Sequence, residues 1–201
     1  MSTHVPEDAT ARLLLDESAI EKSLSRIAHE IIERNAEDGA STLEDVALVG
    51  IQSRGAPLAS RLRRLVEERS GIALPVGALD ITFHRDDVHV RDGGRPPGRH
   101  PVVRATSIAF PIEGMTVVLV DDVLYTGRTI RAAIDALLEY GRPARVQLAV
   151  LVDRGHRELP IRPDFVGKNL PTGRGERIQV ELVEIDERDG VFLVDERQGD
   201  G

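Results

Sequence analysis

The fold of this chain is decided by the stretch Val117-Val118-Leu119-Val120-Asp121-Asp122-Val123-Leu124-Tyr125-Thr126-Gly127-Arg128-Thr129. An apolar segment leads into two carboxylates and then into a small turn rich in hydroxyl groups. A continuous aliphatic run is typical of a buried parallel strand, and open α/β sheets bind ligands in the crevice at the carboxyl ends of such strands. We therefore expect Asp121 and Asp122 at the lip of a ligand-binding crevice.

The turn that follows the two acids has the composition of an anion site. Gly127 lets the backbone approach a ligand closely. The amides and hydroxyls of residues 126–129 and the N-terminus of a helix beginning near Arg128 can converge on one phosphate. The stretch matches neither the Gly-Lys-Ser/Thr phosphate loop nor the G-x-G-x-x-G dinucleotide turn. It suits a ribose 5-phosphate better than a nucleoside triphosphate, although an ordinary capped turn is the alternative.

Length and composition are those of one globular domain. A chain of 201 residues that is 41% hydrophobic can bury a core of its own. It contains no cysteine, so it has no disulfide framework and no zinc thiolate site, and a cytoplasmic protein is expected. A net charge of −8 argues against a protein that coats nucleic acid without sequence preference, but it is compatible with a local basic patch.

Hydrophobic periodicity predicts strands alternating with helices. Asp16 can cap a helix whose apolar residues recur at helical spacing and which ends near Asn35. This alternation implies an α/β fold with a mostly parallel twisted sheet flanked by helices. The other expected elements are strands Val46–Ile51, Val76–Phe83, Val117–Val120 and Val146–Val152, helices from about Pro57 to Arg69 and over 128–140, and short terminal strands Ile178–Glu184 and Val191–Val194.

A single domain is expected over residues 13–195, between a flexible lead, residues 1–12, and a flexible tail, residues 196–201. Within it, the charged stretch His84–Arg104 contains Gly93-Gly94 and Pro96-Pro97. Such composition predicts a mobile lid loop or a strand pair with a long tip.

Three further segments carry chemically useful side chains. The first, Ser53-Arg54-Gly55, follows a predicted strand and can hold a pyrophosphate at the same crevice, although the triplet also suits a plain turn. The second, Arg85-Asp86-Asp87, can close over a departing pyrophosphate, unless it belongs to a solvated hairpin. The third, residues 152–162, can cover a small planar base, and its arginines and histidine also suit RNA phosphates. An ordinary charged loop is the alternative for this third segment.

The signature at 117–129 resembles that of type I phosphoribosyltransferases. Over residues 14–195 the chain also resembles one family within that class, the bifunctional pyrimidine operon attenuators with uracil phosphoribosyltransferase activity, the PyrR family. The Asp153–Arg162 block makes this resemblance specific. The motifs that carry it are Leu24-Ser25-Arg26-Ile27-Ala28-His29-Glu30, Val49-Gly50-Ile51, Asp80 to Asp87, Val123-Leu124-Tyr125 within the signature, Gln147 to Arg162, and Gly167-Lys168-Asn169.

The resemblance implies transfer of phosphoribosyl from phosphoribosyl pyrophosphate (PRPP) to uracil, giving UMP and pyrophosphate, with Mg²⁺ carried by PRPP and held at Asp121 and Asp122. It also implies a small hood over the base, UMP-dependent binding to the leader of pyrimidine-operon mRNA, and a homodimer or homotetramer. The implied catalytic residues are Asp121, Asp122 and Arg85. The implied substrate-binding residues are Ser53, Arg54, Asp121, Asp122, Val123, Leu124, Tyr125, Thr126, Gly127, Arg128, Thr129, Val152, Asp153 and Arg154.

RNA contacts are implied at Ser25, Arg26, His29, Ser53, His156, Arg157, Arg162 and Lys168. Helical spacing offers some support, because Ser25, Arg26 and His29 share the face of their predicted helix opposite its apolar residues. Two other functions stay open. One is a plain salvage phosphoribosyltransferase for uracil or a purine without RNA binding, and the other is an RNA-binding regulator that senses nucleotides with little turnover.

Overall fold

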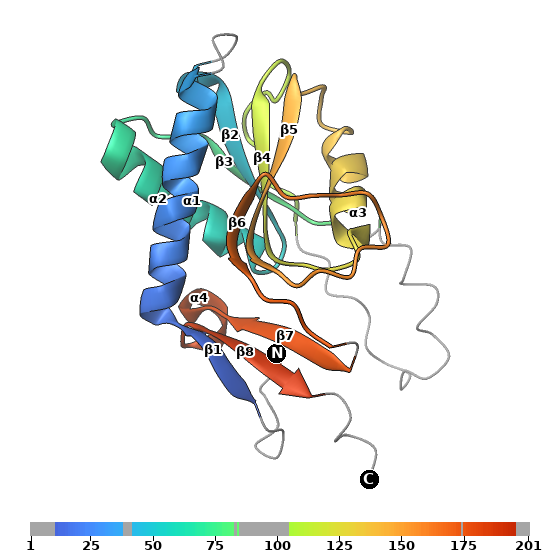
Figure 1. The fold of residues 1–201 in the computed structure, drawn as a ribbon. Helices are drawn as coiled ribbons and strands as arrows, with labels where there is room; N and C mark the ends of the chain where they lie inside the picture. The colour runs from blue at the N-terminus through green and yellow to red at the C-terminus, as the bar shows by residue number, and fades with distance from the viewer. Residues whose placement is uncertain (1–10, 38–41, 83, 85–104, 174, 196–201) are drawn as a thin grey trace.

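A five-stranded parallel sheet forms the centre of the molecule (Figure 1). The computed structural model describes residues 11–37, 42–82, 84, 105–173 and 175–195. Every neighbouring pair of strands in this sheet is parallel, so the predicted α/β fold class is confirmed. The strand order is β3-β2-β4-β5-β6, with β2 at Val46–Ile51, β3 at Val76–Leu79, β4 at Thr116–Leu124, β5 at Arg145–Asp153 and β6 at Phe165–Asn169.

Helices cover both faces of the parallel sheet. Helices α1 (Glu17–Glu37) and α2 (Gly55–Ser70) pack on one face, and α3 (Arg128–Leu137) packs on the other (Figure 1). Successive strand residues point to opposite faces, so Val118 packs in the core with α1 and α2 while Leu119 packs in the core with α3. Burial on both faces explains why these strands are continuous aliphatic runs.

A second, smaller sheet lies below the first in Figure 1. It is antiparallel, with the order β1-β8-β7. Its strands are β1 at Arg12–Asp16, β7 at Glu176–Glu181 and β8 at Gly190–Asp195. The short helix α4 (Val183–Asp186) lies between β7 and β8, and a single 3₁₀ turn (Leu43–Asp45) precedes β2.

Several predicted boundaries are wrong for local reasons. The strand predicted over Val76–Phe83 ends at Leu79, because the Asp80 carboxylate accepts hydrogen bonds from the N–H and hydroxyl of Thr82 and turns the chain. The helix predicted over 128–140 ends at Leu137, where the bonds tighten to the i−3 type, as in the 3.0 Å bond from the Tyr140 N–H to the Leu137 carbonyl.

Other elements are longer, shorter or new. Helix α2 begins at Gly55 rather than Pro57, and β4 continues to Leu124, which places Asp121 and Asp122 inside the strand. The strand predicted over Ile178–Glu184 ends at Glu181 because α4 follows. Strands β1 and β6 are not predicted from the sequence; both have five residues, too few for a clear period.

Several predictions concern residues outside the described structure. These are residues 1–10 of the predicted lead, the tail at 196–201, and residues 85–104 of the predicted lid, among them Arg85. Arg12, at the end of the predicted lead, opens β1. No helix within the described part of the chain is long and apolar enough to cross a membrane.

A network of ion pairs joins helix α2 to the segment Leu182–Asp189. We call this segment the α4 segment. The Arg61 guanidinium donates to both carboxylate oxygens of Glu184 and of Asp189 at 2.5–2.8 Å. Hydrogen bonding to Arg61 lowers the pKa of Glu184. Burial raises the pKa of Asp189, but hydrogen bonds from Arg61 and from the Val183 N–H outweigh it, so the net shift is downward.

Lowered carboxylate pKa values predict acid lability of this connection. The two groups stabilise the fold fully above the pKa of the unfolded chain, about 4, and this stabilisation is lost as pH falls through their folded pKa values. We expect Arg61→Gln to lower the free energy of unfolding by about 2 kcal/mol at pH 7 and to flatten its fall below about pH 4. Denaturant unfolding between pH 3 and 7 measures both effects. Arg64→Gln, which removes an exposed pair with Glu68 on the same helix, should change stability by less than about 1 kcal/mol. Equal pH slopes for wild type and Arg61→Gln would contradict the assignment.

Candidate active site

The acid pair lies near the carboxyl end of β4, in the middle of the parallel sheet. Asp121 is only 6% exposed and Asp122 is half-buried. The Asp122 N–H donates to Asp121 Oδ1 at 3.0 Å, and the Val123 N–H donates to Asp122 Oδ1 at 2.9 Å. These backbone contacts fix both carboxylates in direction, as a site for oriented hydroxyl groups requires.

The turn after β4, residues Tyr125–Arg128, is called the β4 turn here. Gly127 has φ +94° and precedes the first turn of α3. A Cβ at Gly127 would be strained by this φ and would lie 3.3 Å from Leu159 Cβ. The Arg128 N–H donates weakly to Thr126 Oγ1 at 3.3 Å, and the amides of the first helical turn have no partner within the helix itself. This is the arrangement that helix N-termini use to bind phosphate.

The turn after β2, residues Gln52–Arg54, is called the β2 turn here, and it packs directly against β4. A Cβ on Gly55 would lie 2.2 Å from the Val120 carbonyl oxygen and 3.4 Å from the Asp121 Cα. A Cβ on Gly50 would meet the backbone of Gly55 at 2.4 Å. The Gln52-Ser53 peptide bond is cis. Two glycines therefore bring the β2 turn beside the acid pair, as the sequence predicts for Ser53 and Arg54.

The Arg54 side chain has a protein partner that the sequence does not suggest. Its guanidinium donates to both carboxylate oxygens of Asp186 at 2.8, 3.0 and 3.2 Å. Asp186 belongs to the α4 segment, 132 residues along the chain. Arg54 is thus fixed between the crevice and the second sheet.

The loop after β5, residues Arg154–Asp164, is called the β5 loop here and supports the β4 turn. The N–H groups of Glu158 and Leu159 both donate to the Thr126 carbonyl at 3.0 Å. The Arg128 Nε donates to Glu158 Oε2 at 2.7 Å. The conformation of the β4 turn is therefore set by the segment that the sequence assigns to base and RNA contacts.

Two arginines of this loop are engaged within the protein. Arg154 is 7% exposed, lies 3.9 Å over the Tyr125 ring, and donates to the Glu176 carbonyl of β7 at 2.8 Å. Arg157 donates to Asp153 Oδ2 at 2.5 Å and to the carbonyl oxygens of Tyr125 and Ile161 at 2.9 Å. Arg157 thus connects the base of the β5 loop to the β4 turn.

The remaining predicted site residues fall into two groups. The first group lies on the β5 loop and on the adjoining elements β4, β5 and α3. His156 has φ +58° with Nε2 2.5 Å from the Thr172 carbonyl, and it lies with exposed Arg162 on the β5 loop. Val152 is buried in β5, Leu124 is buried at the end of β4, and Thr129 is half-buried at the start of α3.

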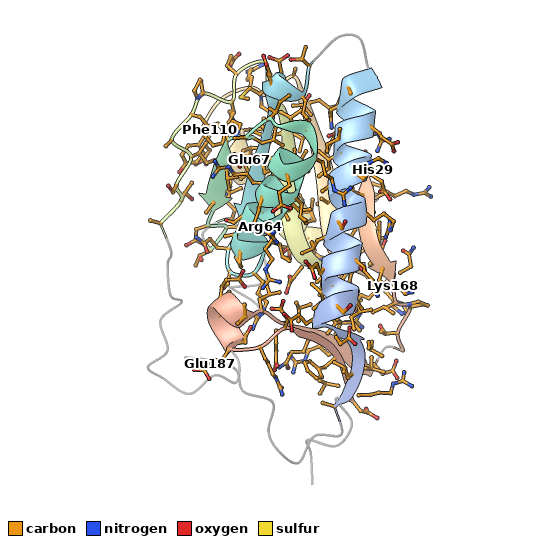
Figure 2. The ribbon with its side chains drawn as sticks, turned by 90° about the vertical axis from the view of Figure 1, so that its left-hand side faces the viewer. His29, Arg64, Glu67, Phe110, Lys168 and Glu187 are labelled. Carbon is orange, nitrogen blue, oxygen red and sulfur yellow. The ribbon has the colours of Figure 1, made fainter. Side chains whose placement is uncertain are left out.

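The second group lies between α1 and β6. Arg26 and Lys168, 142 positions apart in the sequence, line one cavity of about 480 Å³. Arg26 donates to the carbonyl oxygens of Val166 and Gly167 at 2.7 and 2.5 Å. His29, whose side chain is 57% exposed, lies on the same side of the molecule as Lys168 (Figure 2). Ser25 accepts a hydrogen bond from Arg69. The other lining residues are Glu30, Asp164, Val166, Gly167 and Asn169.

The acid pair also fits the metal that the resemblance implies. No group of three or more acidic, histidine or cysteine side chains suited to a metal ion occurs in the described ranges. Mg²⁺ commonly binds through one or two carboxylates together with substrate phosphates and waters. Asp121 and Asp122 provide such a donor set for an ion that arrives with its phosphate ligands.

Comparison with known proteins identifies the family to which this chain is similar. Residues 13–184 match the model of the phosphoribosyl transferase domain. "Bifunctional protein PyrR" of Roseiflexus sp. (strain RS-1) is 61% identical over 90% of this chain and 93% of its own length. The protein of that name from Acetivibrio thermocellus is 53% identical over 92% and 95%.

Solved structures agree on the fold. A hypoxanthine phosphoribosyltransferase from Trypanosoma cruzi in complex with IMP superposes with a TM-score of 0.67 at 16% identity, covering 95% of this chain and 93% of its own. A hypoxanthine phosphoribosyltransferase from Staphylococcus aureus gives 0.64 at 18% identity, with 95% and 96% covered. At such identities the likeness concerns the fold alone. The sequence matches, which span nearly the whole of each relative, go further: the chain belongs to the PyrR family of the phosphoribosyltransferase superfamily.

Proposed function

We propose that this protein transfers phosphoribosyl from PRPP to uracil and, with UMP bound, binds the leader of pyrimidine-operon mRNA. The observation that carries the enzymatic part is the juxtaposition of three features at neighbouring strand ends: the acid pair, the β4 turn and the β2 turn. Together they suit the ribose, the 5-phosphate and the pyrophosphate of one substrate. Membership of the PyrR family supports the regulatory part.

The chemistry asks for positioning and electrostatic stabilisation rather than a nucleophile. As pyrophosphate leaves, positive charge develops on the ribose ring. Asp121 and Asp122 hold the ribose hydroxyls and place negative charge beside that ring. The amides of the β4 turn and the hydroxyls of Thr126 and Thr129 hold the 5-phosphate, which fixes the anomeric carbon relative to the base.

The leaving group, pyrophosphate, binds at the β2 turn. Ser53 and Arg54 bind pyrophosphate, and the resemblance assigns Arg85, which lies outside the described residues, to the same group. When Mg²⁺ is bound, Asp121 and Asp122 would hold it together with the substrate phosphates, and it would supply charge neutralisation to the departing pyrophosphate. Residues Val152, Asp153 and Arg154 border the base.

The RNA surface combines the predicted residues of α1, β6 and the β5 loop with Ser53 of the β2 turn. Arg26, His29 and Lys168 form its first part, in which the exposed Lys168 lines the same cavity as the Arg26–Glu30 ion pair. Unstacked loop bases are the form of RNA that such a surface can read. If UMP tightens RNA binding, RNA must tighten UMP binding by the same factor. Because messenger RNA and nucleotides are cytoplasmic ligands, we expect the protein to act in the cytoplasm, as the homodimer or homotetramer that the resemblance implies.

Turnover with different bases tests the enzymatic proposal. The purified protein with PRPP and Mg²⁺ should convert uracil to UMP, and it should do so with a kcat/KM far above that for hypoxanthine. Preferred use of hypoxanthine would favour the salvage alternative, and no turnover with either base would leave a nucleotide sensor.

Removal of the exposed lysine of β6 tests the RNA surface. Lys168→Gln should weaken binding of leader RNA in the presence of UMP, by about tenfold at low salt, and reduce the salt dependence by about one phosphate contact. Arg64→Gln is the matched control, because it also removes one positive charge but lies on α2, which α1 separates from β6 (Figure 2). Filter binding with and without UMP measures both. Equal loss in the two variants would mean a non-specific charge effect.

Arg157 should affect the enzyme as well as RNA. Its hydrogen bonds to Asp153 and to the Tyr125 carbonyl hold the β4 turn, so Arg157→Ala should raise the KM for PRPP by about tenfold. Steady-state kinetics at saturating uracil measures this effect. An Arg157→Ala enzyme with unchanged kinetics and impaired RNA binding would instead show that Arg157 serves RNA alone.

A further inference from the structure

Asp186 holds Arg54 by one edge of its guanidinium. The Nε and Nη2 groups of Arg54 face the carboxylate, with three contacts between 2.8 and 3.2 Å. The carboxylate is itself fixed, because its side chain is 4% exposed and its Oδ2 accepts the Leu182 N–H at 3.0 Å. Such a bidentate contact determines the plane and direction of the guanidinium.

The other edge of the same guanidinium faces no protein acceptor in the described part of the chain. The Arg54 Nη1 makes no hydrogen bond or ion pair there, and the side chain stays 22% exposed. Arg54 is the last residue of the β2 turn, beside the acid pair. A guanidinium that is fixed on one edge can donate from the other to an anion without losing further side-chain entropy.

We infer that Asp186 is a positioning residue for the pyrophosphate end of the substrate and that it acts through Arg54. The inference rests on the proposed function. It assigns a role to the second sheet, because Asp186 lies between β7 and β8. In its absence the Arg54 side chain would sample several rotamers, and its Nη1 would meet the pyrophosphate oxygens only part of the time.

Kinetics of single and double variants test this role. Asp186→Asn removes the charge at nearly constant shape and should raise the KM for PRPP, and for pyrophosphate in the reverse reaction, by about tenfold. The KM for uracil should change less than about twofold, since the base lies at the other end of the substrate. Because Asp186 acts through Arg54, the double variant Arg54→Gln/Asp186→Asn should be no worse than Arg54→Gln alone.

A purely structural role gives different results. Arg61→Gln breaks the other attachment of the α4 segment, so it should lower thermal stability while leaving the KM for pyrophosphate unchanged. Additive losses in the double variant, or an Asp186→Asn enzyme with only a lower Tm, would overturn the inference. A lower KM in Asp186→Asn would also overturn it, because Asp186 would then be restraining Arg54. Calorimetric binding of PRPP to the same variants tests Asp186 even if wild type fails to use uracil, in which case only the proposed function falls.

Discussion

Replacing Asp122 by Asn should lower kcat for UMP synthesis by about 10²–10³-fold, with a smaller change in the KM for PRPP. An Asn side chain keeps the oxygen that accepts the Val123 N–H, so the backbone near the end of β4 should stay in place. What is lost is the negative charge beside the ring that becomes positive in the transition state. That charge acts in a half-buried site, where water screens it less than at the surface.

Steady-state kinetics with PRPP as the varied substrate measures this effect, and circular dichroism checks the fold. Asp135→Asn is a suitable control, because Asp135 is an exposed acid of α3 whose partner is Arg131 on the same helix. Its kcat should match that of wild type. A kcat for Asp122→Asn within about threefold of wild type would remove the acid pair from the proposed mechanism.

The second large effect is expected from Gly55→Ala, which should cost about 3 kcal/mol of stability or prevent folding altogether. The added methyl would lie 2.2 Å from the Val120 carbonyl oxygen, which belongs to the central strand and cannot move aside. Helix α2 would have to shift away from β4 and take the β2 turn with it. A variant that still folds should therefore also show a raised KM for PRPP.

Gly71→Ala is the matched control at the other end of the same helix. Gly71 has φ +75°, but a Cβ there meets no atom within 4 Å. Gly71→Ala should lower the free energy of unfolding by about 1–2 kcal/mol, because of the left-handed backbone alone. Denaturant unfolding of both variants separates the steric clash at Gly55 from an ordinary glycine effect. If Gly55→Ala and Gly71→Ala lost the same free energy of unfolding, β4 and α2 could separate without a free-energy penalty.

The sequence predicts those parts of the fold whose signal is local. Strand Val46–Ile51 is confirmed with its exact ends, and the helix capped by Asp16 is confirmed by the 2.8 Å bond from the Ala19 N–H to the Asp16 carboxylate. The order of residues in 117–129 specifies a buried strand, an acid pair and a glycine at the start of a helix, each by short-range chemistry. The meeting of this stretch with the β2 turn follows from the topology of parallel sheets.

Side-chain contacts between residues far apart in the chain have no such local signal in the sequence. Asp186 resembles any other acid of a charged segment, and only the folded chain brings it to Arg54. Arg157 reads as an exposed cation within a charged loop, yet its side chain is 22% exposed and bonded on several sides. The burial and the partners of Arg157 depend on the path of the β5 loop rather than on its composition.

The pairing of β1 with β8 has a consequence for the time course of synthesis. Arg12 lies opposite Leu193, so the two strands are separated by almost the whole described chain. Contacts of such long sequence separation form slowly, and β1 must wait for β8 to leave the ribosome. The parallel sheet, by contrast, is encoded between Val46 and Asn169 and can assemble earlier. We therefore expect the Arg54–Asp186 contact to be among the last to form, so that a nascent chain acquires the β4 turn before it acquires the α4 segment, which orients Arg54.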